Sequence, residues 1–514
     1  MAKANKSKWK KVAAVILCMQ AIFTIVTMGI VFKVNLLPDV YMVLMGAVLL
    51  FLLTLSYFFM YLGVKKNKKA NVKKKKRKIY IKRSIGCAIA VFSMIVCSIG
   101  SYAFAKADDT MRNIADQEVM TDTVSVYVLA DNPAESVFDV KDGLFAISGA
   151  YDKAHTDKAI EQINQNVQKT IKTQNYETVL DMVDALYEEN VDAMILNEAY
   201  VDVIESQDGY EDFGKKTKTL FDHEVQTTIT DHSETDDKDI TKDAFVVYIS
   251  GSDTRNLKLA TSRSDVNILA VVNPSTKQVL LVNTPRDYYL DTTASTNGMK
   301  DKLTHCGMYG IDCSMSTLAN LYSESVDYYV QINFNGFQTL IDAIGGITIE
   351  AEKSFRTREG GFYINQGTNQ LNGTVALAYA RERKAFADGD NARGRHQMQM
   401  IEAIIKKVSS GTTILSNYSG IMSSMEGMFA TNMSATEIAS LVKMQLSDGA
   451  SWNVKSFAVS GAGSSQKTFS MPTKRSYVMI PDESQVTYAE LLINKVVDGV
   501  TLTDEDLVMP TVTN

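Results

Sequence analysis

Arginines recur in short motifs in the second half of the chain, including two Arg-x-Arg pairs. They are Arg255, Arg263, Arg286, Arg381, Arg383, Arg393 and Arg395. A guanidinium group donates two parallel hydrogen bonds to a phosphate and cannot lose its charge. Several arginines that converge would repel one another unless an anion were present. Surface ion pairs with the many acidic residues are the ordinary alternative, but the spacing of these motifs favours a cleft that binds phosphate.

Two aspartates accompany the first arginines. Asp253 lies in Gly-Ser-Asp-Thr-Arg, and Asp265 lies in Ser-Arg-Ser-Asp. Aspartates beside a diphosphate suit Mg²⁺, which takes few protein carboxylates and keeps oxygen ligands from phosphate and water. The metal would neutralise the charge that develops on a leaving diphosphate. Taken alone, each aspartate would more often cap a helix or a turn, but beside Arg255 and Arg263 we expect a metal site.

Predicted strands and helices place these residues at element ends. The predicted strands are 244–250, 266–272, 278–282, 328–333 and 454–459. The predicted helices are 336–344, 373–382 and 395–408, and a further helix is expected within 307–325. Asn-Pro-Ser-Thr-Lys at 273–277 is a hairpin turn, and Arg286 follows the strand after it. We expect an α/β domain over 244–500, with a mixed central sheet flanked by helices on both faces.

Residues 106–243 are predicted to form a separate small α/β domain, which we call the accessory unit. Its predicted strands are 123–129 and 191–196, and its predicted helices are 158–172 and 177–188. The acid-rich stretch 231–243 is a plausible linker to the next domain, and 501–514 is a tail. No acid and base side chains in this unit form a recognisable pattern, and we expect it to be a modulator or a partner-binding module.

The net charge of −6 hides a strong asymmetry along the chain. Residues 1–105 hold 18 Lys and Arg and one acid, a net charge of +17, and the remainder has a net charge of −23. A basic N-terminal segment followed by an acidic remainder does not fit nucleic-acid binding by that remainder. It is typical of a membrane anchor that precedes an extracytoplasmic domain.

Three apolar segments within residues 1–105 predict that anchor. They lie at about 12–32, 40–64 and 84–105, and each is near the length that a helix needs to cross a bilayer. Twelve bases lie in the intervening stretch 65–83, and five more Lys precede the first segment. The positive-inside rule puts both regions in the cytoplasm and everything after residue 105 outside the cell. We therefore expect a multi-pass membrane protein with a cytoplasmic N-terminus.

Cysteine and histidine usage adds little. Of the five cysteines, only Cys306 and Cys313 lie after the apolar segments. A disulfide and two free thiols are both open, because spacing alone does not decide the geometry. The five histidines are scattered, so no zinc-type cluster is visible.

The motifs together resemble the LytR-CpsA-Psr family, although each fragment alone is weak. The residues that carry the resemblance are Gly251 to Arg255, Arg263-Ser264-Asp265, Pro285-Arg286-Asp287, Lys302 with His305, Tyr379-Ala380-Arg381-Glu382-Arg383, Gly389-Asp390 and Arg393-Gly394-Arg395-His396-Gln397. The three-span anchor and the accessory unit resemble the capsule-locus branch of this family in streptococci.

The resemblance implies a phosphotransferase. Family members move a glycopolymer, here a capsular polysaccharide, from a polyprenyl diphosphate carrier onto peptidoglycan and form a phosphodiester link. Arg286, Asp253 and Asp265 match the catalytic residues, and both aspartates match ligands of Mg²⁺. The residues implied to bind the diphosphate lipid are Arg255, Arg263, Arg381, Arg383, Asp390, Arg393 and Gln397. The implied partners are the lipid-linked polymer, peptidoglycan, the bilayer and capsule assembly proteins.

The prenyl tail of such a substrate needs an apolar site. Candidate tunnel residues are Phe337, Leu340, Ile341, Ile344, Met400, Ile404 and Ile405. Taken one by one, ordinary core packing is the more common role for each of them. Two other functions stay open. A lipid-diphosphate hydrolase would use the same site with water as acceptor, and a membrane-bound regulator of capsule expression would act through the basic stretch 65–83.

Overall fold

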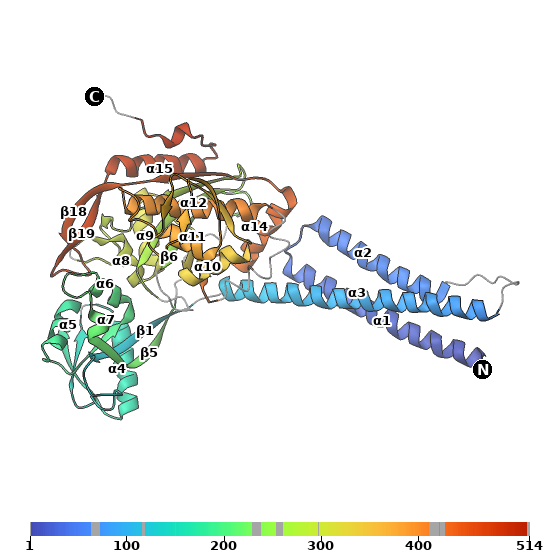
Figure 1. Cartoon of the computed structure of the whole chain (residues 1–514), viewed down its shortest axis with the longest axis horizontal. Helices are drawn as coiled ribbons and strands as arrows, with labels where there is room; N and C mark the ends of the chain where they lie inside the picture. Colours follow the sequence, from blue (N-terminus) through green and yellow to red (C-terminus); the bar gives the residue numbers. More distant parts are fainter. Residues whose placement is uncertain are drawn as a thin grey trace. The chain divides into compact units, whose positions relative to one another are not determined.

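The computed structural model describes residues 2–62, 72–115, 119–149, 151–228, 238–252, 261–296, 298–410, 421 and 427–510 (Figure 1). The chain divides into two compact units. The first consists of Met1–Asn113, Ile414–Ser423 and Ser434–Ala450, and the second contains the remaining residues. Each unit is described by itself.

Three long helices make up most of the first unit (Figure 1). They are α1 (Ala2–Val34), α2 (Asp39–Tyr57), which the π-helix η1 (Phe58–Leu62) extends, and α3 (Val72–Ala115). The stretches Lys8–Val34, Asp39–Tyr61 and Arg77–Asn113 are long and apolar enough to cross a membrane. The expectation of three apolar N-terminal helices is therefore confirmed.

Helix α3 is longer than the sequence suggested. We expected a loop over 65–83 and a span over 84–105, whereas the helix begins at Val72 and ends at Ala115. Lys and Arg are good helix formers, and residues 72–83 contain no Gly or Pro to interrupt a helix. The rest of the expected loop, up to residue 71, lies outside the described residues.

Helix α14 (Ala435–Asp448) also belongs to the first unit, although it follows strands of the second in sequence. It begins with a capping box, which fixes its N-terminus. Its Ala439 packs in an apolar cluster with Met111 of α3. Lys443 Nζ lies 2.9 Å from Asp39 Oδ1, at the start of α2. These contacts attach α14 to the ends of the apolar helices.

The accessory unit contains a five-stranded mixed sheet in the order β3-β2-β4-β1-β5. Its strands are β1 (Val119–Leu129), β2 (Leu144–Ser148), β3 (Lys172–Tyr176), β4 (Ala193–Asn197) and β5 (Thr217–Thr228). Its helices are α4 (Lys153–Val167), α5 (Val179–Tyr187), η2 (Glu198–Tyr200), α6 (Val201–Glu205) and α7 (Phe213–Lys216). One apolar cluster lies between the sheet and α4, and a second lies between the sheet and α5 to α7.

The larger sheet has six strands in the order β16-β11-β6-β7-β8-β17. They are β6 (Phe245–Ser252), β7 (Ser264–Asn273), β8 (Gln278–Asn283), β11 (Tyr328–Asn333), β16 (Phe429–Thr431) and β17 (Asn453–Ala458). Pairs β6–β11 and β8–β17 are parallel, and the other three are antiparallel. The expected mixed sheet is confirmed.

Helices cover both faces of this sheet, as expected (Figure 1). On one face lie α8 (Leu303–Cys306), η3 (Gly307–Tyr309), α9 (Ile311–Tyr322) and α15 (Glu483–Val497). On the other lie α10 (Phe334–Ala343), α11 (Gly373–Ala380) and α12 (Asp390–Ser409). A short 3-10 helix, η4 (Glu505–Leu507), follows α15.

Four short antiparallel strand pairs complete the described fold. They are β9 (Tyr289–Leu290) with β10 (Asp301–Lys302), β12 (Ile347–Ala351) with β15 (Gly367–Leu371), β13 (Phe355–Arg356) with β14 (Tyr363–Ile364), and β18 (Gly461–Lys467) with β19 (Arg475–Pro481). The sequence analysis anticipated none of these pairs.

A cluster of aromatic rings ties α11 and α12 to β13. The ring centroid of His396 lies 4.4 Å from that of Tyr379 and 4.7 Å from that of Phe386. It also stacks on Phe355 at 6.2 Å. His396 is 4% exposed, and burial lowers its pKa to about 4. The imidazole is therefore a neutral core group that helps to fix α11, which the first Arg-x-Arg pair follows, and α12, which contains the second.

We expect His396→Phe to weaken the acid sensitivity of the fold. An unfolded histidine has a pKa near ~6.5, so on acidification the unfolded state takes up a proton that the folded state refuses. The contribution of the neutral His396 to the free energy of unfolding is fully present above about pH 6.5. It declines as the pH falls, by about 2 kcal/mol between about pH 7 and about pH 5. Thermal unfolding of the detergent-solubilised chain across this range measures the difference. An identical pH dependence in the parent and the variant would contradict the assignment.

Candidate active site

Several strand ends meet at one edge of the six-stranded sheet. The parallel strands β6 and β11 end side by side at Ser252 and Asn333. Strand β8 ends at Asn283, opposite Ile268 in the first half of β7. Because β7 runs antiparallel to both β6 and β8, its first residues lie at this same edge. Carboxyl ends of strands in open α/β sheets are the usual place for ligands.

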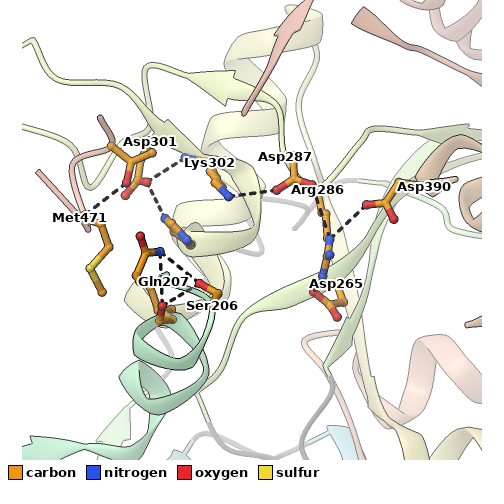
Figure 2. Close-up of polar contacts among 12 residues, drawn as sticks. Ser206, Gln207, Asp265, Arg286, Asp287, Asp301, Lys302, Asp390 and Met471 are labelled. Atoms are coloured by element: carbon orange, nitrogen blue, oxygen red, sulfur yellow. Dashed lines mark hydrogen bonds and ion pairs between the residues drawn. The ribbon is translucent and has the colours of Figure 1, made fainter. Parts of the chain in front are cut away.

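Arg286 and Asp265 form an ion pair at this edge (Figure 2). Arg286 Nη1 donates to Asp265 Oδ1 at 2.8 Å. Asp265 is the second residue of β7, and Arg286 lies just beyond the end of β8. The amide of Thr304 donates to the carbonyl of Arg286 at 2.8 Å, so α8 holds the backbone of this arginine in place.

The carboxylate of Asp390 lies among three arginines. Its Oδ2 lies 3.4 Å from Arg286 Nε and 3.3 Å from Arg393 Nη2. Its Oδ1 lies 3.5 Å from Arg383 Nη1. Asp390 begins α12, and Arg393 lies one turn further on the same helix face. From this position Asp390 can orient all three guanidinium groups.

Figure 2 also shows how this group continues away from the sheet edge. Arg286 Nε lies 3.7 Å from Asp287 Oδ2, and Lys302 Nζ lies 3.3 Å from Asp287 Oδ1. Asp287 therefore connects the positive charge of Arg286 to a second cation on β10. This alternation of charges keeps the arginine ordered without a ligand.

The charged groups shift one another's pKa values. Burial alone would raise the pKa of Asp265, but Arg286, Arg393 and Arg263 hold it well below its usual range. Burial lowers the pKa of Arg393, and the positive charge of Arg286 lowers it further. Asp265 is therefore ionised at any physiological pH, while the repulsion between the two arginines remains incompletely compensated.

Arg381 lies just after the end of α11, where the helix dipole favours a cation. Its Nη1 lies 2.6 Å from Glu359 Oε2, in the turn between β13 and β14. Its guanidinium lies 4.2 Å from the ring centroid of Phe334, the first residue of α10. The flat guanidinium is thus supported on one face and paired at one edge.

These side chains line a cavity of about 490 Å³. Among the described residues, its cations are Arg263, Arg286, Arg358, Arg381, Arg383, Lys384 and Arg393. Its described carboxylates are Asp265, Glu359 and Glu382. Asp390, Asp287 and Asp202 pair with these arginines from outside the lining and reduce the excess of four charges. The cations still outnumber the carboxylates, and a net positive charge in a partly enclosed space attracts an anion.

An apolar cavity of about 80 Å³ adjoins the cationic one. Both cavities share Val266, Phe334, Arg381 and Gln397. Its other lining residues are Ile249, Gly251, Ile332, Asn333, Phe337, Leu377, Ala380, Met400 and Ile401. Of the candidate tunnel residues, Phe337 and Met400 therefore line it, whereas Ile341 and Ile344 are buried in the core. The shared residues join the cationic cavity to the apolar one.

Most residues expected at the site lie together. Arg263, Asp265, Arg286, Arg381, Arg383, Arg393 and Gln397 line the cationic cavity. Asp253 and Arg255 lie outside the described residues. Arg395, the second arginine of its pair, is directed elsewhere, because it pairs with Asp388 and lies 3.9 Å from Glu352. The chemical role of each residue stays a prediction.

Sequence reasoning missed three charged residues of the cavity. Arg358 and Glu359 come from the turn between β13 and β14, and Lys384 follows the first Arg-x-Arg pair. The buried carboxylate of Glu382 accepts hydrogen bonds from the amides of Arg358 and Lys384, at 2.5 and 2.7 Å, and so joins both loops. An isolated arginine in a Gly-rich turn carries no spacing signal from which this position could be inferred.

His305 and the two cysteines after the anchor are buried structural groups. His305 Nδ1 lies 2.6 Å from Asp301 Oδ1, and the amide of Ser470 donates to Asp301 Oδ2 at 3.0 Å. Cys306 and Cys313 are free thiols, so the disulfide alternative is not formed. Neither cysteine lines the cationic cavity.

The described residues alone do not make a metal site. No group of three or more His, Cys, Asp or Glu side chains among them is placed to hold a metal ion. Asp265 is ionised but already paired with Arg286, and Asp253 lies outside the described residues. Mg²⁺ prefers several oxygen ligands, so a metal fits beside Asp265 only with an anion that supplies further oxygens. Mg²⁺ therefore stays a proposal.

Comparison with models of protein families gives two matches. Residues 211–485, more than half of the chain, match the LytR-CpsA-Psr family. Residues 82–196 match a DNA polymerase processivity factor. The second range is less than a quarter of the chain and begins inside α3, and a match of this extent assigns no family.

Two relatives are named polyisoprenyl-teichoic acid–peptidoglycan teichoic acid transferase TagU. The protein from Enterococcus faecalis is 34% identical over 195 residues, which are 38% of this chain and 63% of the relative. The protein from Oceanobacillus iheyensis is 35% identical over 180 residues, which are 34% of this chain and 54% of the relative. The match thus spans between half and two thirds of each relative's length.

Solved structures are also similar. The crystal structure of B. subtilis TagV is 26% identical, with a TM-score of 0.43, and the match covers 51% of this chain and 99% of that one. A structure of TagT bound to LI-WTA is 25% identical, with a TM-score of 0.41 and coverage of 52% and 96%. The match of more than half of the sequence to one family model decides the assignment: the chain belongs to the LytR-CpsA-Psr family.

Proposed function

We propose that the chain transfers a glycopolymer from a polyprenyl diphosphate carrier to peptidoglycan through a phosphodiester bond. The observation that supports this most is the junction of two unlike cavities. One has four more cations than carboxylates among its described lining residues, and the other is lined mainly by apolar side chains. A prenyl diphosphate has the same two parts, a highly charged group and a hydrocarbon chain, joined directly.

The arginines perform the binding step in this proposal. The diphosphate accepts hydrogen bonds from Arg286, Arg381 and Arg393, and its charge relieves the repulsion that lowers the pKa of Arg393. Gln397 lies one turn beyond Arg393 on α12, where an amide can donate to a phosphate oxygen without adding charge. Binding and charge compensation therefore occur together.

Transfer needs position and charge stabilisation more than covalent catalysis. A hydroxyl oxygen of peptidoglycan attacks the phosphorus next to the polymer and forms the new P–O bond. The bond from that phosphorus to the bridging oxygen breaks, and the polyprenyl monophosphate leaves with its electron pair. Arg286 stabilises the added negative charge, and Asp265 and Asp390 hold its guanidinium in place. The hydroxyl proton passes to solvent or to a base.

We propose that Mg²⁺ accompanies the diphosphate, with Asp265 and Asp253 as its protein ligands. When bound, the ion would neutralise part of the charge on the leaving phosphate. The low pKa of Asp265 keeps this carboxylate available as an anionic ligand throughout the physiological range. The surrounding arginines disfavour a bare cation, so we expect metal and diphosphate to bind as one complex.

The apolar helices fit a substrate that never leaves the bilayer. Confinement to a surface raises the effective concentration of enzyme and lipid for one another. We propose that the N-terminus is cytoplasmic and the catalytic sheet extracellular. Basic residues are concentrated before the first apolar segment and in the stretch 65–83, and both regions would then face the cytoplasm.

The relatives are named for teichoic acid. We propose a capsular polysaccharide as the polymer here, because the three-span anchor and the accessory unit resemble those of the capsule-locus branch of the family.

The function can be tested with two arginines that each pair with an aspartate, one at the cavity and one away from it. Arg286→Ala should reduce transfer at least about 100-fold, because it removes a charge placed at the reacting phosphate. Arg395→Ala is the matched control, since Arg395 pairs with Asp388 and does not line the cavity. Polymer linked to peptidoglycan in cells that depend on each variant measures the effect, with membrane levels of protein as the check on folding.

Wild-type amounts of wall-linked polymer in the Arg286→Ala strain would remove the proposed function. Release of phosphorylated polymer into the medium by the unmodified protein, with none attached to the wall, would favour hydrolysis instead.

The apolar cavity gives a second test. Ala380 is 7% exposed and lines this cavity, so Ala380→Phe should fill it. We expect the affinity for farnesyl diphosphate to fall at least about tenfold, because buried methylene groups contribute roughly 0.8 kcal/mol each. The affinity for inorganic pyrophosphate, which has no chain, should stay the same. Isothermal titration calorimetry measures both, and an equal loss for the two ligands would argue against a lipid-binding role.

A further inference from the structure

The accessory unit reaches the cationic cavity. Ser206, which follows α6, is one of the residues that line it (Figure 2). Asp202, on α6 itself, lies with its Oδ2 3.4 Å from Nη2 of Arg263. An acid of one domain thus pairs with an arginine that the family motif assigns to the diphosphate. A role of Arg263 confined to the larger sheet and its substrate does not explain why an acid of the accessory unit pairs with it.

The accessory unit is packed firmly against the catalytic sheet's loops. Met308 and Met471 lie within the apolar cluster that contains α5 and α6. The hydroxyl of Tyr151 donates to the carbonyl of Phe469 at 3.0 Å, and the amide of Thr261 donates to Asp122 at 3.0 Å. Asp202 is therefore held at the cavity by a packed interface, and not by the ion pair alone.

The ion pair itself is open to exchange. The side chain of Asp202 is 49% exposed, and that of Arg263 is 18% exposed. Partly solvated pairs of this kind contribute little to stability. The Nε of Arg263 is buried and has no hydrogen-bond partner among the described residues. Within the described part of the chain, Asp202 is the carboxylate that an ion pair joins to Arg263, and the buried Nε donor is unsatisfied, so this guanidinium can still bind a stronger acceptor.

The two cavities indicate which part of a donor would face Asp202. Arg263 and Ser206 line the cationic cavity but not the apolar one. A prenyl chain in the apolar cavity would therefore leave the phosphate nearer the polymer on the side of Arg263. This step rests on the proposed function.

We propose that Asp202 of the accessory unit holds the place of a donor phosphate on Arg263 and thereby sets the affinity for the donor. Without donor, its carboxylate pairs with the guanidinium and keeps it ordered. When the diphosphate binds, a phosphate oxygen takes that guanidinium, and the displaced carboxylate remains nearby as a repelling charge. The accessory unit then lowers the affinity for the lipid-linked donor and for any phosphorylated product at the same position.

The test compares Asp202→Asn with the unmodified full chain in detergent micelles. We expect the Kd for farnesyl diphosphate to fall about three- to fivefold, because the competing charge is lost while the side-chain size is kept. The KM for a lipid-linked donor should fall similarly, with kcat no higher. Asp202→Glu should retain the affinity of the parent. If Asp202 only supported the fold, its replacement by Asn would raise KM or lower the unfolding temperature instead.

Asp157→Asn is the matched control in the same unit. Asp157 lies on α4 and pairs with Lys153, and its side chain is 56% exposed. It should leave the Kd unchanged. If the parent binds farnesyl diphosphate and Asp202→Asn binds it with an unchanged or higher Kd, this inference alone would be overturned. Failure of the parent to bind farnesyl diphosphate would overturn both the inference and the proposed function.

Discussion

Repulsion between guanidinium groups is the constraint on which the site depends. Two like charges about 4 Å apart repel by about 1 kcal/mol in water and several times more in a partly buried cavity. Asp265 and Asp390 each bind Arg286 and so reduce this cost, but the described cations of the cavity outnumber the carboxylates. The protein keeps an excess of positive charge at one place, which is useful only if an anion completes it.

The rest of the described fold supports that excess. The antiparallel setting of β7 between β6 and β8 brings Asp265 beside Arg286. The aromatic cluster around His396 fixes α11 and α12, whose ends carry the remaining arginines. The apolar side of α12 then continues from Gln397 to Met400 and Ile401, which line the second cavity. One helix therefore passes from the cationic cavity to the apolar cavity within two turns.

Patterns in the sequence were sufficient for the elements with strong periodicity. The hairpin β7–β8 and the strand β11 lie where alternation and a turn motif placed them. Helix α12 contains the predicted range 395–408 but begins five residues earlier, at Asp390. Motif spacing also brought together Arg286, Asp265 and the arginines of α11 and α12. Arg358 and Asp202 could not be found this way, because they reach the cavity through a Gly-rich turn and a domain interface. Such contacts depend on long-range packing, which leaves no local pattern in the sequence.

The most direct measurement is the identity of the amphiphile that stays bound when the full chain is purified from a bacterial membrane. Mass spectrometry of the extracted lipid should find a polyprenyl diphosphate, with or without attached sugars, at near-stoichiometric amounts, and Arg286→Ala should lose most of it. If only ordinary phospholipids were present, in equal amounts with both proteins, and added prenyl diphosphate did not replace them, the cationic and apolar cavities would not form one lipid diphosphate site.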